Sequence, residues 1–292
     1  MRVAWNGVDL STPDSWEPVA MGKRTLTLGP SGHPALDLKW NPIRGRFAAD
    51  KHLKRMARGF PAKQGGSLKK ANPPGGFPSR WNSRIFFTWE LAGERGGGCL
   101  LYDAKAGAAL AAQWRTAYRD EAVKALSGLH MSGNGSDIPF ALYDIRAVMP
   151  AGYELGTYAF QPGLFRLTFQ TKKSEIELSR FGPAEVLLKQ GMHGFLEKQY
   201  GEFLKNTEAS ETPEGLLMQP RRAPSYPLRL AGRLGRRKPY KRLEAWRPEG
   251  SNRILCLRAA SASPLDAELL REVRMNYVLV PQEKAGSADH SA

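Results

Sequence analysis

LFRLTF at residues 164–169 and IELSRF at residues 176–181 each alternate apolar with polar side chains. Successive side chains of a β-strand point to opposite faces of its sheet, so this alternation predicts two half-buried strands. Gly163 precedes the pair and Pro183 follows it, and both residue types interrupt regular structure. We therefore predict an antiparallel strand pair between residues 164 and 181.

The first half of the chain contains a matching pair, TLTL at 25–28 and LDLKW at 36–40. A proline and an aromatic–glutamate pair precede each set of strands. In the first half the motif is Pro13-x-x-Trp16-Glu17, and in the second it is Pro150-x-x-Tyr153-Glu154. Self-similarity at a fixed offset is typical of a repeated architecture, so these motifs predict an internal duplication.

Later features recur in the same order. Trp89 lies ten residues before Cys99, and Trp246 lies ten residues before Cys256. GERGGGC (93–99) predicts the turn of a hairpin, because consecutive glycines favour turns. A helix is predicted over 106–126 and another over 263–280, where Ser263 is suited to cap the helix and Pro264 to its first turn.

These patterns predict an α+β fold with two related halves, each an antiparallel sheet packed with helices. The predicted first repeat spans residues 1–135 and the second spans 136–281, with a disordered tail at 282–292. A chain of 292 residues has room for two domains of ordinary size, each able to bury its own core.

Each half resembles the Mog1/PsbP-like α/β/α sandwich family. The resemblance lies in Pro150-Ala151-Gly152-Tyr153 entering a strand pair, in the strand from Gly163 to Phe169, and in the helical stretch from Pro183 to Leu204. The family includes photosystem accessory proteins, a small-GTPase-binding protein and many uncharacterised bacterial members. It has no common catalytic residue, so the resemblance implies a fold and leaves the activity open.

The positive charge of the chain is concentrated in two segments. Residues 51–84 hold nine Lys or Arg and no acid, and residues 219–242 hold nine more and no acid. These cations exceed the formal net charge of +15, so the remainder of the chain is slightly acidic. The first segment predicts a helix at 51–60 followed by a Gly/Pro-rich loop at 65–80 without regular structure.

Arginine gives bidentate contacts to phosphate, and an aromatic ring offers a stacking surface for an unpaired base. We therefore predict a non-catalytic binding or scaffold protein that presents its basic, aromatic-bearing segments to a polyanion, with nucleic acid as the first candidate partner. The candidate binding residues are Arg55, Arg58, Lys69, Lys70, Arg80, Trp81, Arg221, Arg222, Arg233, Arg236, Arg237, Lys238, Tyr240 and Arg242. For Trp81 a place in the core is an equally weighted alternative.

Two alternatives remain open at this stage. An acidic protein partner would fit the same segments, in which case the chain is a protein–protein adaptor. An enzyme whose catalytic site assembles only in three dimensions is the third interpretation, less favoured than the other two. A charged stretch can also be a solvated surface without a partner.

Several other classes of function lack a signal. The two cysteines, Cys99 and Cys256, are too few for a disulfide framework and predict reduced, buried thiols and a cytoplasmic location. The sequence predicts neither a secretory signal at the N-terminus nor an apolar stretch long enough to span a membrane. None of the five histidines has metal-ligand spacing, so no metal, cofactor or catalytic residue is predicted.

Overall fold

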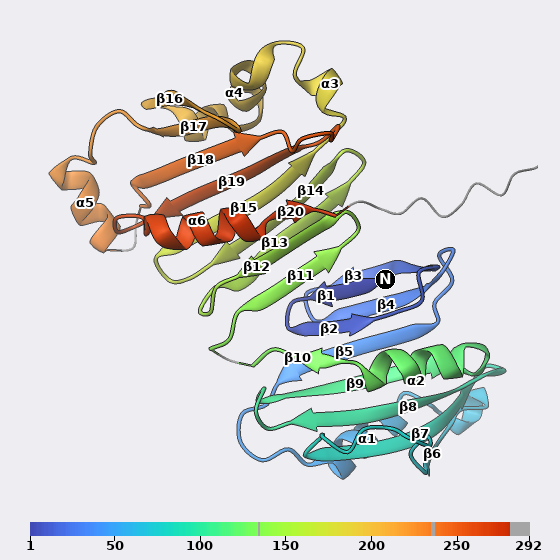
Figure 1. Ribbon diagram of the computed structural model, residues 1–292. Coiled ribbons are helices and arrows are strands. Elements are labelled where there is room, and N and C mark those ends of the chain that lie inside the picture. Colours follow the sequence, from blue (N-terminus) through green and yellow to red (C-terminus); the bar gives the residue numbers. More distant parts are fainter. Residues whose placement is uncertain (134, 235–236, 281–292) are drawn as a thin grey trace, which may run out of the picture. The chain divides into compact units, whose positions relative to one another are not determined.

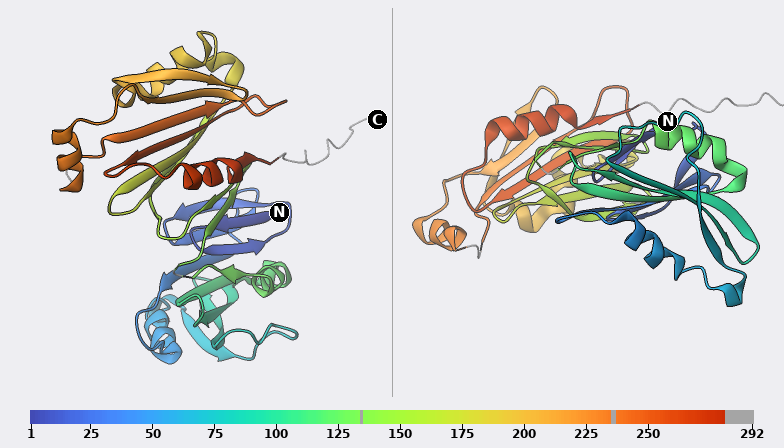
Figure 2. Two further views of the ribbon diagram at one scale, coloured as in Figure 1. Left: turned by 60° about the vertical axis from the view of Figure 1, so that its left-hand side comes forward. Right: turned by 90° about the horizontal axis from the view of Figure 1, so that it is seen from below.

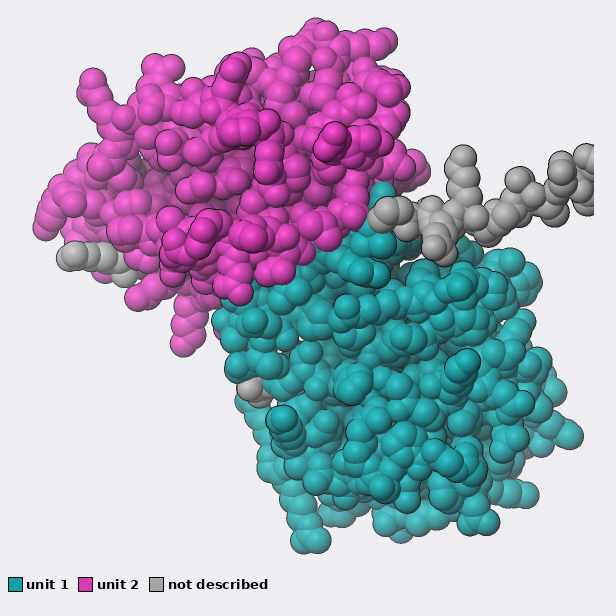
Figure 3. Space-filling model, viewed as in Figure 1, with its two compact units in different colours: residues 1–151, 280–292 teal, residues 152–279 magenta. Residues whose placement is uncertain are grey.

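The computed structural model describes residues 1–133, 135–234 and 237–280. It divides into two compact units, unit 1 with residues 1–151 and the chain from residue 280 onward, and unit 2 with residues 152–279 (Figure 3). Within the described residues, antiparallel sheets predominate and six α-helices accompany them (Figures 1 and 2). The structure confirms the predicted combination of antiparallel sheets with helices. The predicted tail at 282–292 lies outside the described residues.

Unit 1 contains a small sheet in which the antiparallel order β10-β2-β1-β11-β12 occurs. Its strands are β1 (Arg2–Trp5), β2 (Val8–Ser11), β10 (His130–Met131), β11 (Ile138–Leu142) and β12 (Ile145–Met149). Since β11 and β12 belong to this sheet, the boundary between the units falls later in the chain than residue 135, where the first predicted repeat ends.

The large sheet of unit 1 has the order β3-β4-β5-β9-β8-β7-β6. Its strands are β3 (Trp16–Gly22), β4 (Thr25–Pro30), β5 (Leu36–Pro42), β6 (Ser67–Ala71), β7 (Ser83–Leu91), β8 (Glu94–Asp103) and β9 (Ala108–Arg115). Helices α1 (Ala49–Ala57) and α2 (Arg119–Ser127) lie on opposite faces of this sheet (Figure 2). Leu53 of α1 packs against Phe87 and Leu100.

The sheet of unit 2 has the order β13-β14-β15-β19-β18-β17-β16. Its strands are β13 (Glu154–Gln161), β14 (Leu164–Gln170), β15 (Ser174–Phe181), β16 (Thr207–Thr212), β17 (Gly215–Pro220), β18 (Tyr240–Trp246) and β19 (Ile254–Ser261). The other elements are α3 (Ala184–Leu187), α4 (Gly191–Leu204), α5 (Tyr226–Arg233), α6 (Ala267–Asn276) and β20 (Val278–Leu279).

Two helices cover opposite faces of the unit 2 sheet. Phe195 and Leu196 of α4 pack in one cluster with Leu243 and Cys256. Trp246 is three residues after Leu243 on β18, so the two side chains point to opposite faces of the sheet. The ring of Trp246 packs edge to face against Tyr277, just after α6, with the ring centres 5.8 Å apart. Because strand side chains alternate between faces, α6 lies on the face that α4 leaves free.

Both large sheets have the same strand order, with each strand number raised by ten in unit 2. An internal duplication would produce this order. The first sequence anchor occupies equivalent places, since Trp16 begins β3 and Tyr153 directly precedes β13.

The second sequence anchor does not occupy equivalent places. Trp89 and Cys99 lie on β7 and β8, whereas Trp246 and Cys256 lie on β18 and β19. Residues that face each other across a hairpin are often about ten residues apart in the chain. The same Trp–Cys spacing therefore occurs in two hairpins that are not equivalent in the two units. Both cysteines are buried free thiols rather than disulfides, as predicted, and burial raises the pKa of both thiols.

The helix predicted over 106–126 is wrong in its first half. Residues 108–115 form β9, in which Ala108, Leu110, Ala112 and Trp114 are buried in strict alternation. Alanine favours helices, but pairing with β5 and β8 on both sides outweighs that preference. The helix predicted over 263–280 forms only at 267–276, and Asp266 rather than Ser263 caps it by accepting a hydrogen bond from the Leu269 backbone N–H at 3.1 Å.

The Gly/Pro-rich stretch at 65–80 also differs from the prediction, because it contains β6. This strand is at one edge of the seven-stranded sheet, where it pairs with β7, so it needs little intrinsic strand preference. Its lysines are exposed, as is common in edge strands that avoid pairing with other molecules.

The glycines predicted to form a turn at 93–99 lie mostly inside β8, since only Ala92 and Gly93 have the positive φ angles of the turn. Aromatic rings fold closely over these glycines. A Cβ on Gly98 would lie 2.3 Å from the ring of Phe87 and 2.6 Å from the carbonyl oxygen of Ala112.

We predict that Gly98→Ala lowers the free energy of unfolding of unit 1 by about 2 kcal/mol, because the added methyl group overpacks the strand. Six of the seven tryptophans lie in unit 1, so fluorescence during urea denaturation measures this change. Gly75→Ala is the control, since a Cβ there would meet no atom within 4 Å. Equal stability of both variants would contradict the close approach at Gly98.

Candidate functional site

The first basic segment is spread over both faces of the unit 1 sheet. Lys70 on β6 lies directly across from Phe87 on β7, and Phe87 packs against α1. The side chain of Lys70 is therefore on the α1 face of the sheet, and that of Lys69 is on the opposite face. The ammonium group of Lys70 lies 2.6 Å from the carboxylate of Asp50 on α1. Arg55 on α1 and Arg58 just after it are exposed.

Arg80 and Trp81 lie away from that helix and near the end of α2. The guanidinium of Arg80 donates to the carbonyl oxygen of Leu129 and lies 5.0 Å from the centre of the Trp81 ring. Trp81 itself is only 6% exposed. Its ring therefore belongs to the core and offers no free face to an unpaired base, which favours the core alternative for this residue.

The second basic segment forms one wall of a cleft in unit 2. This wall is made by the end of β17, the loop after it, α5 and the residues that lead into β18. The turn from α4 to β16 forms the other wall. We refer to this cavity of about 700 Å³ as the basic cleft. Its charged lining residues are Lys205, Arg221, Arg222, Arg237, Lys238, Lys241 and a single acid, Glu202.

Some cations of the basic cleft are held by neighbouring groups. The Arg221 side chain donates to the carbonyl oxygen of Thr207 at 3.2 Å. Lys241 donates to the carbonyl oxygen of Phe203 at 3.3 Å and lies 5.1 Å from the centre of its ring. These contacts fix the side chains and leave their charges uncompensated.

Two arginines are exposed at the cleft without such contacts. Within the described residues, neither Arg222 nor Arg237 has an ion pair or a side-chain hydrogen bond in the structure. The one acid of the cleft is already engaged, because Glu202 lies 2.7 Å from Lys205. The hydrogen bond from Lys205 lowers the pKa of Glu202, so this acid is ionised and its charge is paired with Lys205.

Two further residues predicted in this segment do not line the basic cleft. Tyr240 and Arg242 alternate with Lys241 on β18 and so point to the opposite face of the sheet, where Arg242 pairs with Glu244 at 2.7 Å. Arg236 lies outside the described residues. Arg233 is the last residue of α5, but its side chain is not described.

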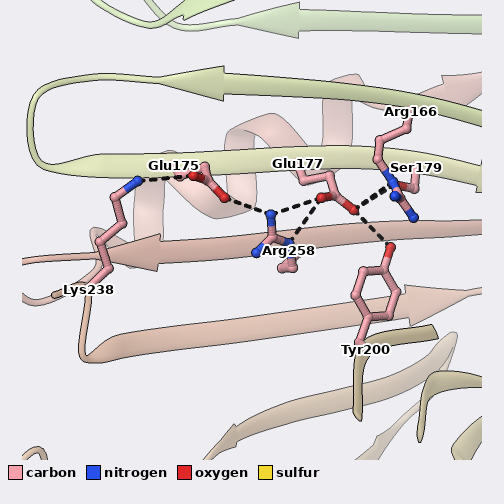
Figure 4. Close-up of polar contacts among 7 residues, drawn as sticks. All are labelled: Arg166, Glu175, Glu177, Ser179, Tyr200, Lys238 and Arg258. Carbon is pink, nitrogen blue, oxygen red and sulfur yellow. Dashed lines mark hydrogen bonds and ion pairs between the residues drawn. The ribbon is translucent and has the colours of Figure 1, made fainter. Parts of the chain in front are cut away.

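A polar network adjoins the basic cleft through Lys238, which lies 3.1 Å from Glu175 (Figure 4). Glu175, Glu177 and Ser179 share one face of β15. Arg258 of β19 joins the two carboxylates, at 2.6 Å from Glu175 and 2.9 Å from Glu177.

Glu177 is the centre of this network and is buried (Figure 4). Its carboxylate accepts hydrogen bonds from Ser179 at 2.9 Å and from Tyr200 at 3.1 Å, and Arg166 lies at 3.2 Å. A buried charge is tolerated when it is paired and hydrogen-bonded, and Glu177 meets both conditions.

The network shifts the ionisation of its members. Burial opposes ionisation of Glu175, but the hydrogen bond from Lys238 and the charge of Arg258 outweigh it and lower the pKa of Glu175. Burial likewise opposes the charge on Arg258, yet the two carboxylates raise its pKa. Burial raises the pKa of Tyr200 well above its usual value, so its hydroxyl remains a donor.

The lowered pKa of Glu175 implies a pH-dependent contribution to stability. A carboxylate with a lowered folded-state pKa stabilises the fold above its unfolded pKa, and the contribution is lost as pH falls through the folded value. We predict that Glu175→Gln costs about 1 kcal/mol at neutral pH, a small value because the group is partly exposed.

This cost should shrink toward zero between about pH 5 and about pH 3. Urea denaturation of both proteins, followed by circular dichroism at each pH, measures it. A cost that stayed constant with pH would contradict the role assigned to the charge of Glu175.

Sequence reasoning missed Lys205, Lys241 and every member of the polar network except Lys238. The signal was present in SEIELSRF (174–181), where Glu175, Glu177 and Ser179 occupy alternate positions in a strand whose other residues are largely apolar. The alternation predicts a half-buried strand, and the structure shows that Tyr200 of α4 contacts its polar face as well. Within the described part of the chain, no group of three His, Cys, Asp or Glu residues is suited to hold a metal ion.

Comparisons with known proteins do not assign the chain to a family. No family model matches it, and no curated protein matches it. The immunity protein TplEi of T6SS from Pseudomonas aeruginosa, solved with "L" peptide, is 11% identical with a TM-score of 0.33, covering 92% of this chain and 99% of that one. MucB in complex with MucA(peri) is 7% identical with a TM-score of 0.22, covering 96% and 94%. Scores of this size carry no structural argument.

No α-helix in the described ranges combines the length and the apolar character of a membrane span.

Proposed function

We propose that the chain is a non-catalytic binding protein whose basic cleft receives a polyanion, with nucleic acid as the first candidate. The observation that carries the proposal is the imbalance of charge in the cleft, where six cations face one carboxylate that is itself paired with Lys205. A concave surface lined by one sign of charge concentrates ions of the other sign.

The chemistry of the cations favours phosphate. Arg222 and Arg237 are exposed and able to make bidentate contacts with phosphate oxygens. Arg221, Lys238 and Lys241 are held by backbone or carboxylate groups and lose little conformational entropy when they bind.

The first basic segment has a smaller part in this proposal. Arg55 and Arg58 are exposed, but Lys70 is paired with Asp50 and Arg80 with a backbone carbonyl. We further propose that each half belongs to the Mog1/PsbP-like class and that the protein acts in the cytoplasm. The matching strand orders and the buried, unbonded thiols support these two proposals.

The test is a titration of fluorescent 20-nucleotide single-stranded and double-stranded DNA and RNA at about 50 mM and about 200 mM salt. We expect tight binding at the lower concentration and much weaker binding at the higher one, because each phosphate contact releases a counterion. Absence of binding at low salt for all four probes would remove nucleic acid. Binding of heparin alone would retain a polyanion and exclude nucleic acid.

A further inference from the structure

Helix α5 exposes an apolar stripe that neither the core nor the basic cleft uses. Tyr226 is 68% exposed, Leu230 44% and Leu234, directly after the helix, 62%. Residues four apart lie on the same side of a helix, so these three side chains form one row along α5. Exposed large apolar side chains that gather on one element indicate an interaction surface.

The stripe faces away from the body of unit 2. The opposite side of α5 approaches the body closely at Gly232, where a Cβ would lie 2.7 Å from the carbonyl oxygen of Ala262. Leu228, almost half a turn from Tyr226 around the helix, lines the basic cleft. Figures 1 and 2 show α5 at the rim of unit 2, beyond the ends of β17 and β18 and apart from α4 and α6.

The stretch of chain that contains the stripe carries only positive charges. Arg229 lies on α5, and Arg222 and Arg237 lie on either side of it in the chain, all three exposed. The sequence contains no acidic residue between 215 and 243. The partner of this surface must therefore accept apolar side chains and carry negative charge over a wider area.

We propose that α5 docks on an anionic lipid surface, with Tyr226, Leu230 and Leu234 inserted at the level of the headgroups. An interfacial helix has this composition, with aromatic and leucine side chains on one face and arginines beside them. The helix is short, so its apolar row alone would bind weakly, and the flanking arginines supply attraction to lipid phosphates and carboxylates. A nucleic acid would contact the arginines but would leave the leucines in water.

A flat anionic surface also suits the placement of these groups. Arg229 lies on α5 beside the apolar row, and Arg222 and Arg237 lie within four residues of the two ends of the helix, so a surface laid against the row is within reach of these long side chains. A narrow groove in a protein would enclose the row but exclude the arginines on either side. The charge complementarity therefore favours a bilayer over an acidic protein.

The test uses the full chain with vesicles of phosphatidylcholine alone and with 30% phosphatidylserine, about the anionic content of a charged leaflet. Leu234→Cys is labelled with an environment-sensitive dye, which is selective because Cys99 and Cys256 are buried. We expect a blue shift and co-sedimentation with the anionic vesicles only. Failure of the native chain to bind anionic vesicles would overturn the proposal, whether or not it binds nucleic acid.

Two variants separate lipid docking from simple charge attraction. Leu230→Ser/Leu234→Ser should lower vesicle binding at least tenfold and leave nucleic-acid binding unchanged. Val186→Ser/Met275→Ser removes two apolar side chains of similar exposure elsewhere in unit 2 and should change neither. Equal vesicle binding by both double variants would mean that the leucines do not insert, and the inference would be wrong.

Discussion

Replacing Arg221, Arg222 and Arg237 with alanine is expected to lower the affinity for a 20-nucleotide single strand about a hundredfold at low salt. All three arginines line the basic cleft, and together they are half of its cations. A loss of roughly 1 kcal/mol for each arginine–phosphate contact gives this result, since about 2.7 kcal/mol corresponds to a hundredfold change. Fluorescence anisotropy of the labelled strand measures it.

The salt dependence should change together with the affinity. For a single strand, each neutralised phosphate contributes about 0.7 to the slope of log K against log salt. Loss of three contacts should therefore reduce the slope by about 2. A lower affinity with an unchanged slope would indicate a damaged fold rather than lost phosphate contacts.

A charge-matched variant controls for the net charge of the chain. Lys172→Ala/Lys173→Ala/Lys189→Ala removes three exposed cations from the same unit, none of which lines the basic cleft. We expect this variant to bind nearly as well as the native chain. Equal losses for both triple variants would show that diffuse charge attracts the polyanion and that the cleft has no special part.

The strand framework was predictable because it depends on local alternation. TLTL, LDLKW, LFRLTF and IELSRF all form strands, since a sheet with one covered face needs that pattern. The alanine-rich β9 was not predictable in the same way. Half of its residues are alanines, at buried and at partly exposed positions alike, so polarity does not reveal the period of two, and only pairing with β5 and β8 settles it.

The candidate site was predictable in part, for a related reason. Composition identified 219–242 as basic, but it could not show which of its side chains share a face. Alternation along β18 separates Lys241 from Tyr240 and Arg242, and the α4–β16 turn brings Lys205 from elsewhere in the chain. Convergence of this kind depends on the register of paired strands, which a single sequence does not specify.

Removal of the Glu177 carboxylate should destabilise unit 2 more than any other single change proposed here. Glu177→Ala leaves Arg258 and Arg166 without their shared buried acid and leaves the Tyr200 hydroxyl without its acceptor. Breaking a buried ion pair by removing one partner costs about 3–5 kcal/mol, because an uncompensated charge stays in a poorly solvated place. Glu175 still contacts Arg258, so the lower end of that range applies.

Two further variants give the expected order of effects. Glu177→Gln retains an acceptor for Ser179 and Tyr200 and loses only the charge, so its cost should be intermediate. Glu268→Ala breaks an exposed pair with Arg271 on α6 and should change stability by less than about 0.5 kcal/mol.

Because unit 2 contains a single tryptophan, urea denaturation is best followed by circular dichroism together with hydrogen exchange of β15 and β19. If Glu177→Ala were no more costly than Glu268→Ala, the Glu177 carboxylate would not compensate the charges of Arg258 and Arg166.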